Sequence, residues 1–207
     1  MRVAQPEDRR RLLAELQESI RRIERRPARR GGGVPCGLAE IDAAVPCGFP
    51  RGAISELAGG AASGKTAVAL ALLAGLGPEE LFAWVDGRGE LYPPAAAARG
   101  VDLRRLLIVR PAAAAGGSAA LWAAEALLGS SAFAAVVVDV PLRRADRGWD
   151  AMARRLQSAA EKGGAVGLWL ASPRAPARLP AALRLELAAE GGRVVARRMV
   201  GGIGRVA

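Results

Sequence analysis

The segment Gly59–Thr66, Gly-Gly-Ala-Ala-Ser-Gly-Lys-Thr, constrains the fold of this chain more than any other stretch. It satisfies the phosphate-loop pattern of a glycine, four residues and then Gly-Lys-Thr. The flanks favour the same structure, because Ala53–Leu57 is typical of a strand and Ala67–Leu76 of an apolar helix. The alternative is a chance match in a chain rich in alanine and glycine. The order of strand, loop and helix favours a true phosphate loop.

This loop predicts a nucleotide site. Its glycines let backbone N–H groups point at phosphate oxygens, and the helix that follows offers the positive end of its dipole. Lys65 can reach the β- and γ-phosphates, and the Thr66 hydroxyl is placed to ligate magnesium. We therefore expect ATP and Mg²⁺ as cofactors. The nucleotide contacts would come from Gly59, Gly60, Ala61, Ala62, Ser63, Gly64, Lys65 and Thr66.

The composition limits where such a chain can work. Of its 207 residues, 51% are hydrophobic, yet no apolar run is long enough to span a bilayer, and the N-terminus lacks the apolar core of a secretory signal. Cys36 and Cys47 are too few for a disulfide framework and have no histidine to complete a zinc site. We expect a cytoplasmic protein. The formal net charge of +10 favours nucleic acid or an acidic protein surface as partner.

The pattern divides the chain into two parts. Residues 1–30 predict an amphipathic helix and a basic linker, because Leu12, Leu16 and Ile20 repeat at helical spacing and Pro27 ends the helix. The apolar stripe either packs on its own domain or docks on a neighbouring protomer or a partner. Residues 31–207 form the nucleotide-binding core.

Elements of the core alternate as in an α/β protein with a mainly parallel central sheet flanked by helices. A C-terminal β-hairpin follows, with both of its strands expected at an exposed sheet edge because arginine alternates along them. Strands are predicted at 81–85, 106–109, 134–138, 165–171, 183–188 and 193–199, and helices at 38–45, 94–99, 118–128 and 149–161.

Asp139 closes the apolar strand Ala134–Val138. An acid at the end of such a strand commonly holds magnesium, directly or through water, opposite the phosphate-loop hydroxyl. We therefore expect Thr66 and Asp139 to form the metal site. The simpler interpretation is an aspartate that caps the following turn.

The approach to the phosphate loop also carries a family resemblance. Leu38-x-x-Ile41-Asp42 is followed by Gly48-Phe49-Pro50-x-Gly52, a strand and the loop, and this order resembles the RecA-type ATPase core. The resemblance covers Leu38 to Ser172. It implies a sheet built as above and a nucleotide base near Tyr92, the only tyrosine, although ordinary surface packing explains Tyr92 equally well.

Two departures from the RecA pattern concern hydrolysis. The resemblance implies a catalytic glutamate beyond Trp84-Val85-Asp86, and this chain has Arg88 there, with Glu90 as the nearest acid. It also implies a polar residue, commonly glutamine, at the γ-phosphate, where this chain has Ser172. Glu90 is therefore the candidate catalytic residue, and we expect ATP binding with weak or absent ATPase activity.

RecA binds DNA through two loops, and the corresponding stretches here are short. They carry arginines suited to DNA phosphates or to a protein partner, although solvated arginines without a ligand are as plausible. These candidate contacts are Arg143, Arg144, Arg147, Arg174 and Arg178.

The short core, clipped loops and replaced glutamate resemble the ImuA family of accessory proteins in bacterial mutasomes. That resemblance implies DNA-damage-induced mutagenesis in the SOS response, DNA repair and translesion synthesis. The implied partners are an ImuB-like polymerase-related protein and an error-prone replicative-type polymerase, with self-association through the N-terminal helix and DNA binding as further possibilities. A DNA-dependent ATPase that modulates recombination filaments is the first alternative, and a SulA-like cell-division inhibitor is the second.

Overall fold

The protein is described here by a computed structural model, which covers residues 32–111, 116–141, 149–172 and 181–198. The predicted helix within residues 1–30 lies outside this range and stays a prediction. So do the five arginines proposed for DNA, Arg143, Arg144, Arg147, Arg174 and Arg178. No helix in the described ranges is long and apolar enough to cross a lipid bilayer.

A seven-stranded sheet forms the centre of the fold, in the order β5-β4-β6-β7-β3-β8-β9. All neighbouring strands run parallel except β8 and β9, which pair antiparallel as a hairpin. This confirms the α/β class and the mainly parallel sheet predicted from the sequence. The strands are β3 (Ala53–Ala58), β4 (Leu81–Asp86), β5 (Leu106–Val109), β6 (Phe133–Asp139), β7 (Val166–Ala171), β8 (Leu183–Glu190) and β9 (Arg193–Arg198).

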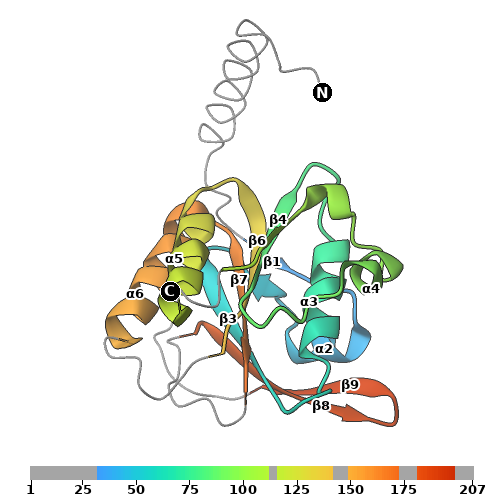
Figure 1. The fold of residues 1–207 in the computed structure, drawn as a ribbon. Coiled ribbons are helices and arrows are strands. Elements are labelled where there is room, and N and C mark those ends of the chain that lie inside the picture. Colours follow the sequence, from blue (N-terminus) through green and yellow to red (C-terminus); the bar gives the residue numbers. More distant parts are fainter. Residues whose placement is uncertain (1–31, 112–115, 142–148, 173–180, 199–207) are drawn as a thin grey trace, which may run out of the picture.

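Helices cover both faces of this sheet (Figure 1). On one side lie α5 and α6, and on the other α2, α3 and α4. The sequence missed only short elements, the antiparallel pair β1 (Gly33–Val34) and β2 (Phe49–Pro50) and the 3₁₀ turn η1 (Leu103–Arg105). The helices are α2 (Ala39–Ala44), α3 (Lys65–Ala74), α4 (Pro93–Ala98), α5 (Gly116–Gly129) and α6 (Trp149–Gly163).

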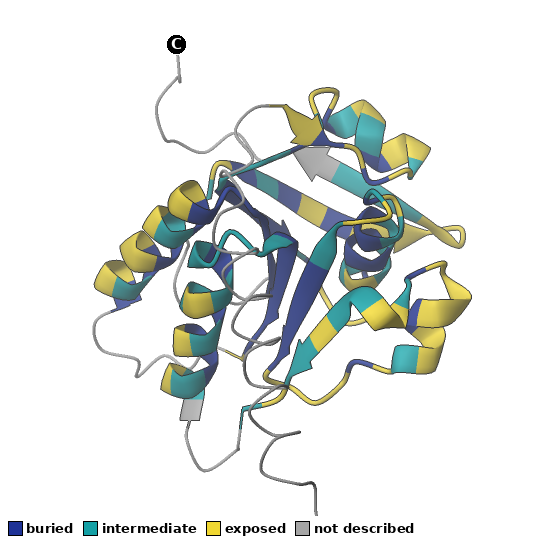
Figure 2. Ribbon diagram, turned by 90° about the horizontal axis from the view of Figure 1, so that it is seen from above, coloured by how far each residue is buried: buried dark blue, intermediate teal, exposed yellow. Residues whose placement is uncertain are grey.

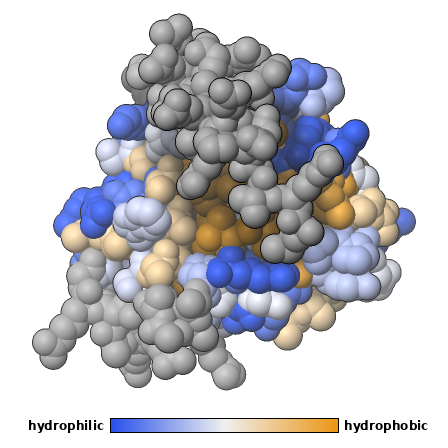
Figure 3. Space-filling model, turned by 45° about the horizontal axis from the view of Figure 1, so that its top comes forward, coloured by the Kyte–Doolittle hydropathy of each residue, from blue (hydrophilic) through white to orange (hydrophobic). Residues whose placement is uncertain are grey.

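The apolar side chains form two clusters, one on each face of the sheet. Side chains alternate along a strand, so Val137 of β6 joins the cluster beneath α3, whereas Val136 and Val138 join the one beneath α5 and α6. Figure 2 shows the result, buried central strands between helices whose outer faces are exposed. The surface view in Figure 3 shows hydrophobic residues gathered toward the middle of one face and hydrophilic ones toward its rim.

One prediction about the hairpin is wrong. Of the two hairpin strands, β9 lies at a sheet edge and β8 does not, because β8 pairs with β3 on one side and with β9 on the other. Its residues Leu183, Leu185 and Leu187 are buried, and they alternate with more exposed ones. The alternating pattern was therefore a sign of one buried face and not of an edge position.

Candidate phosphate-binding site

The features predicted to form a site meet at one edge of the sheet. Because β3, β4, β6 and β7 are parallel, their carboxyl ends lie together, and ligands of open α/β sheets bind outside this edge. Asp86 and Asp139 are register partners on β4 and β6. The phosphate loop follows β3, and Ser172 follows β7. The phosphate loop, Asp139 and Ser172 are therefore brought to one side of the molecule.

The side chain of Lys65 folds back on the phosphate loop and forms hydrogen bonds with it. Its ammonium donates to the carbonyl oxygens of Gly59 and Gly60, both at 2.7 Å, and to the Ser63 hydroxyl at 3.2 Å. Gly64 precedes α3 with φ of +92°, a left-handed conformation that glycine adopts without strain. A phosphate in the loop would replace these carbonyls as the partner of the ammonium.

The β8–β9 hairpin packs against this loop. A Cβ on Gly59 would come within 2.7 Å of the Leu187 carbonyl oxygen, and one on Gly64 within 2.8 Å of Cγ1 of Val194. Real Cβ atoms do not approach that closely, so the hairpin leaves no room for a side chain at Gly64, and the hairpin and Ser63 together leave none at Gly59. This contact could not be predicted from local sequence patterns, since it joins segments far apart in the chain.

Lys65 lies within electrostatic range of two further charges. Burial lowers the pKa of its ammonium, Asp139 opposes that shift and Arg88 adds to it. The three side chains therefore share one site, as the phosphate-loop mechanism requires for Lys65 and Asp139. Arg88 was recognised in the sequence at the place of the catalytic glutamate, but its contact with Asp139 was not predicted.

Arg88 forms an ion pair with Asp139, in which its Nε donates to Oδ1 at 2.8 Å. The Asp139 side chain is 11% exposed and that of Arg88 is 32% exposed. Burial raises the pKa of Asp139, Arg88 opposes the shift, and the neighbouring Glu90 and Asp86 carboxylates reinforce it. A positive side chain therefore lies on the carboxylate that was predicted to hold a metal ion.

The loop that carries Arg88 is fixed by Asp86, whose fully buried carboxylate accepts bonds from the backbone N–H of Glu90 at 3.0 Å and of Leu91 at 3.3 Å. Arg110 donates to the same carboxylate at 2.8 Å and to the Leu91 carbonyl at 2.8 Å. The sequence analysis missed Arg110. Its place just after β5, next to the end of β4, was the available signal.

The other predicted site residues are more open to solvent. Glu90 is exposed, although its carboxylate is close enough to help raise the pKa of Asp139. Tyr92 is 67% exposed and precedes α4, and Ser172 is exposed just beyond β7. Thr66 lies in the first turn of α3 and is also exposed.

Magnesium fits these residues only in part. Thr66 offers an exposed hydroxyl, but Asp139 is already paired with a guanidinium and Asp86 with Arg110 and two backbone donors. Within the described ranges, no group of three or more acidic, histidine or cysteine side chains gathers as a metal site. A metal ion bound directly at Oδ1 of Asp139 would have to displace Arg88.

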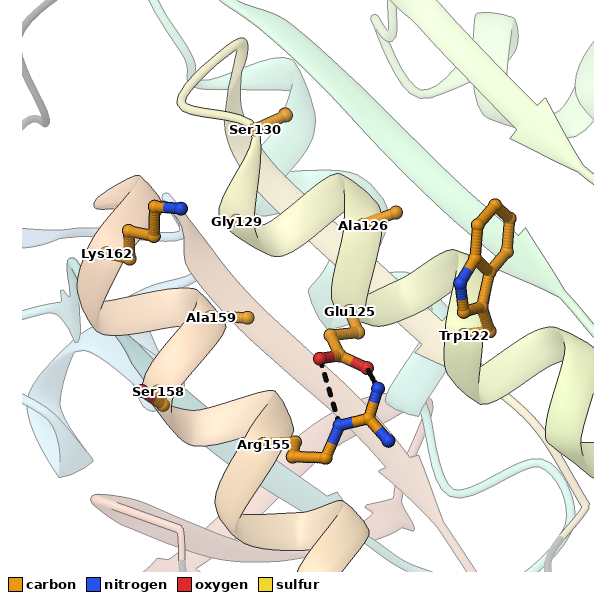
Figure 4. Close-up of a pocket in the computed structure, with 9 residues that line it drawn as sticks. All are labelled: Trp122, Glu125, Ala126, Gly129, Ser130, Arg155, Ser158, Ala159 and Lys162. Atoms are coloured by element: carbon orange, nitrogen blue, oxygen red, sulfur yellow. Dashed lines mark hydrogen bonds and ion pairs between the residues drawn. The ribbon is translucent and has the colours of Figure 1, made fainter.

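A separate groove lies between α5 and α6 (Figure 4). Its volume is about 490 Å³, and its lining includes Trp122, Ser158 and Lys162. Glu125 of α5 and Arg155 of α6 bridge it through two bonds of 3.1 and 2.6 Å. None of the predicted site residues lines this groove.

The parallel sheet, the loop after β3 and the acid closing β6 define the P-loop class of α/β proteins. Within that class the chain belongs to the RecA family, since the family model of the RecA N-terminal domain matches residues 16–143. The RecA resemblance seen in the sequence is therefore confirmed.

Curated relatives agree with this assignment. Protein RecA of Picosynechococcus sp. is 38% identical over 107 residues, which cover 51% of this chain and 30% of that relative. Protein RecA of Lactobacillus delbrueckii subsp. bulgaricus is 38% identical over 108 residues, covering 51% and 32%. Protein RecA of Salinispora tropica is 37% identical over 123 residues, covering 58% and 34%. The chain spans about a third of the length of these relatives.

Proposed function

We propose that this chain is an ATP-binding accessory protein in DNA-damage-induced mutagenesis and translesion synthesis. It would work in the cytoplasm as part of the SOS response, with ATP governing its assembly with polymerase partners. The observation that carries the proposal is an intact phosphate loop beside an Asp139 that is held by Arg88. Such a site keeps the groups that bind phosphate, while a cation lies where hydrolysis would need a base or a metal.

Binding follows from the loop. Its N–H groups, the start of α3 and the Lys65 ammonium would take the phosphates, with Lys65 leaving the Gly59 and Gly60 carbonyls. Tyr92 would supply a flat surface for the base. Ser172 and Glu90 lie at the same edge of the sheet, and the backbone N–H of Glu90 donates to Asp86.

The test is isothermal calorimetry of ATP binding to the full chain and to Lys65→Ala. We expect Lys65→Ala to lower the affinity by at least about tenfold, because it removes the main phosphate cation. Lys162→Ala is the matched control, since Lys162 is the only other lysine and lines the separate groove between α5 and α6. Equal binding by Lys65→Ala and the unchanged chain would contradict the nucleotide role.

A second candidate is a DNA-dependent ATPase that acts on recombination filaments. The observation in its favour is Glu90, whose carboxylate is close enough to influence Asp139. ATP turnover measured with and without single-stranded DNA separates the candidates. Turnover that DNA stimulates and Glu90→Gln abolishes would favour this second function. A SulA-like division inhibitor would need no nucleotide site, so ATP binding counts against it.

The proposed partners are an ImuB-like polymerase-related protein and an error-prone replicative-type polymerase. We propose that the stripe of Leu12, Leu16 and Ile20 provides the contact, because an apolar stripe beside a glycine-rich linker must be buried against something. Replacement of Leu16 and Ile20 by glutamate in the full chain should abolish capture of a purified ImuB-like protein. Capture at full strength would contradict this part of the proposal.

DNA is a further proposed partner, through the arginines of residues 142–148 and 173–180. Contacts of this kind are made to phosphates and depend strongly on salt. Replacing Arg143, Arg144 and Arg147 by glutamine should weaken binding to single-stranded DNA of any sequence and flatten its salt dependence. An unchanged salt slope would remove these residues from the DNA surface.

A further inference from the structure

We propose that Arg88 is a built-in cation of the nucleotide site, which neutralises Asp139 in place of magnesium and lets the chain bind ATP without a metal ion. This inference rests on the proposed binding of nucleotide at the phosphate loop.

The position of Arg88 is built into the fold. The backbone N–H of Gly87 donates to the Asp139 carbonyl at 2.9 Å, which ties the start of the loop to the end of β6. At the other end, Asp86 binds the N–H groups of Glu90 and Leu91. Arg88 lies between these two anchors, so its side chain is held above Asp139 by a closed turn.

Gly87 and Gly89 make that turn sterically possible. A Cβ on Gly87 would lie 3.2 Å from the Asp139 carbonyl oxygen and 3.1 Å from Val140 Cγ2. Gly89 has φ of +70°, a conformation that most residues adopt only with strain. The sequence Asp-Gly-Arg-Gly-Glu therefore forms a tight turn after β4, which places the side chain of Arg88 against Asp139 at the end of β6.

The two buried carboxylates at this edge, Asp86 and Asp139, are already paired with arginines. Asp86 is bound by Arg110 and two backbone N–H groups, and Asp139 is bound by Arg88. Lys65 adds a second positive charge that interacts with both Asp139 and Arg88. A magnesium ion placed here would share the Asp139 carboxylate with Arg88 and would meet two cations.

The same arrangement suits a phosphate. Within the described residues, the bond of Arg88 to Asp139 uses Nε, and the guanidinium has further N–H donors on its two Nη atoms. A guanidinium binds carboxylate and phosphate through the same planar fork of donors. Arg88 can therefore keep Asp139 while it contributes charge to the terminal phosphate beside Lys65.

The experiment is calorimetry of ATP binding to the full chain in excess Mg²⁺ and in EDTA. For the unchanged chain we expect dissociation constants that agree within about threefold. For Arg88→Gln we expect the affinity in EDTA to fall by about tenfold or more and Mg²⁺ to restore part of it, because Asp139 is released for the metal. Arg88→Lys should bind without metal more strongly than Arg88→Gln does, since it keeps the charge.

Arg104→Gln is the matched control, because Arg104 is largely exposed in η1, at the amino end of β5 and away from the site. It should bind ATP as the unchanged chain does. Circular dichroism and urea unfolding show whether each variant is folded.

Two results overturn the inference and leave the proposed function standing. One is ATP binding by the unchanged chain that weakens more than about tenfold in EDTA, and the other is metal-independent binding by Arg88→Gln. Absence of ATP binding in both conditions would instead overturn the proposed function.

Discussion

Glu56 of β3 and Arg184 of β8 are register partners, and their side chains form an ion pair of 2.7 Å inside the sheet. Glu56 is 8% exposed and Arg184 is 11% exposed. The pair fastens the hairpin to the strand that leads into the phosphate loop. Residues of β8 and β9 also pack closely against Gly59 and Gly64 of that loop. The ion pair therefore helps to hold the hairpin beside the candidate site.

We predict that Arg184→Met destabilises the fold by about 3 kcal/mol or more, because it leaves the buried Glu56 carboxylate without its cation. The free energy of unfolding in urea measures the loss. Pairing the change with Glu56→Gln should recover part of it. Arg155→Met is the control, since its ion pair with Glu125 is 58% and 26% exposed, and it should cost less than about 1 kcal/mol. Equal costs for the two arginines would contradict this account.

A second prediction concerns Gly64. Gly64→Ala should cost about 1–3 kcal/mol, because it forces alanine to φ of +92° and drives its Cβ into Val194. Urea unfolding again gives the measurement. Gly60→Ala should change stability by no more than about 0.5 kcal/mol, since a Cβ there meets nothing within 4 Å. Adding Val194→Ala to Gly64→Ala should restore only the packing part of the loss.

Most strands of the sheet can be predicted from the sequence, because apolar runs such as Ala134–Val138 are bounded by glycine, proline and acids. The predicted bounds of β5 agree with the structure, and Asp139 closes β6 as expected. Residue 88 was recognised as an arginine in place of an acid. That it pairs with Asp139, 51 positions away, depends on the parallel β4–β6 pairing and the return of the loop, which no local pattern specifies.

The hairpin illustrates the same limit. Its turn at Gly191-Gly192 and its two strands could be predicted from local sequence, because a pair of glycines between two strand-like segments is typical of a hairpin turn. Both glycines do adopt positive φ in the structure. Its parallel pairing with β3 was not, since strand neighbours distant in sequence carry no local signal. The contacts of Leu187 and Val194 with the phosphate loop follow from that pairing and were missed with it.

A third prediction separates the two cysteines. Cys36 is buried and Cys47 is exposed, and both are free thiols. Burial raises the pKa of Cys36 to about 12 from an ordinary 9.0, so it stays a neutral thiol. Native protein should react at Cys47 alone with a thiol reagent such as 5,5′-dithiobis(2-nitrobenzoate), and at both in denaturant. Rapid native labelling of Cys36 would contradict this.

The raised pKa of Cys36 also makes the free energy of unfolding depend on pH. The folded state keeps the Cys36 proton at pH values where the unfolded chain loses it. The free energy of unfolding should therefore be unaffected by this group below about pH 9 and fall between pH 9 and 12. Cys36→Ala should reduce the fall over that interval, compared by urea unfolding at each pH.

The last prediction tests how the Arg88 turn is held. Asp86 is fully buried and half-exposed Arg110 is its cation, so Arg110→Met should cost about 2 kcal/mol by leaving a charge with only backbone donors. It should also loosen the turn, because Arg110 binds both Asp86 and the Leu91 carbonyl. Hydrogen exchange at the Glu90 and Leu91 amides, which donate to Asp86, should then speed up more than exchange in β6. Exposed Arg99 offers the matched control, Arg99→Met, which should leave these amides protected. Unchanged exchange in Arg110→Met would mean that Asp86 and the glycines alone position Arg88.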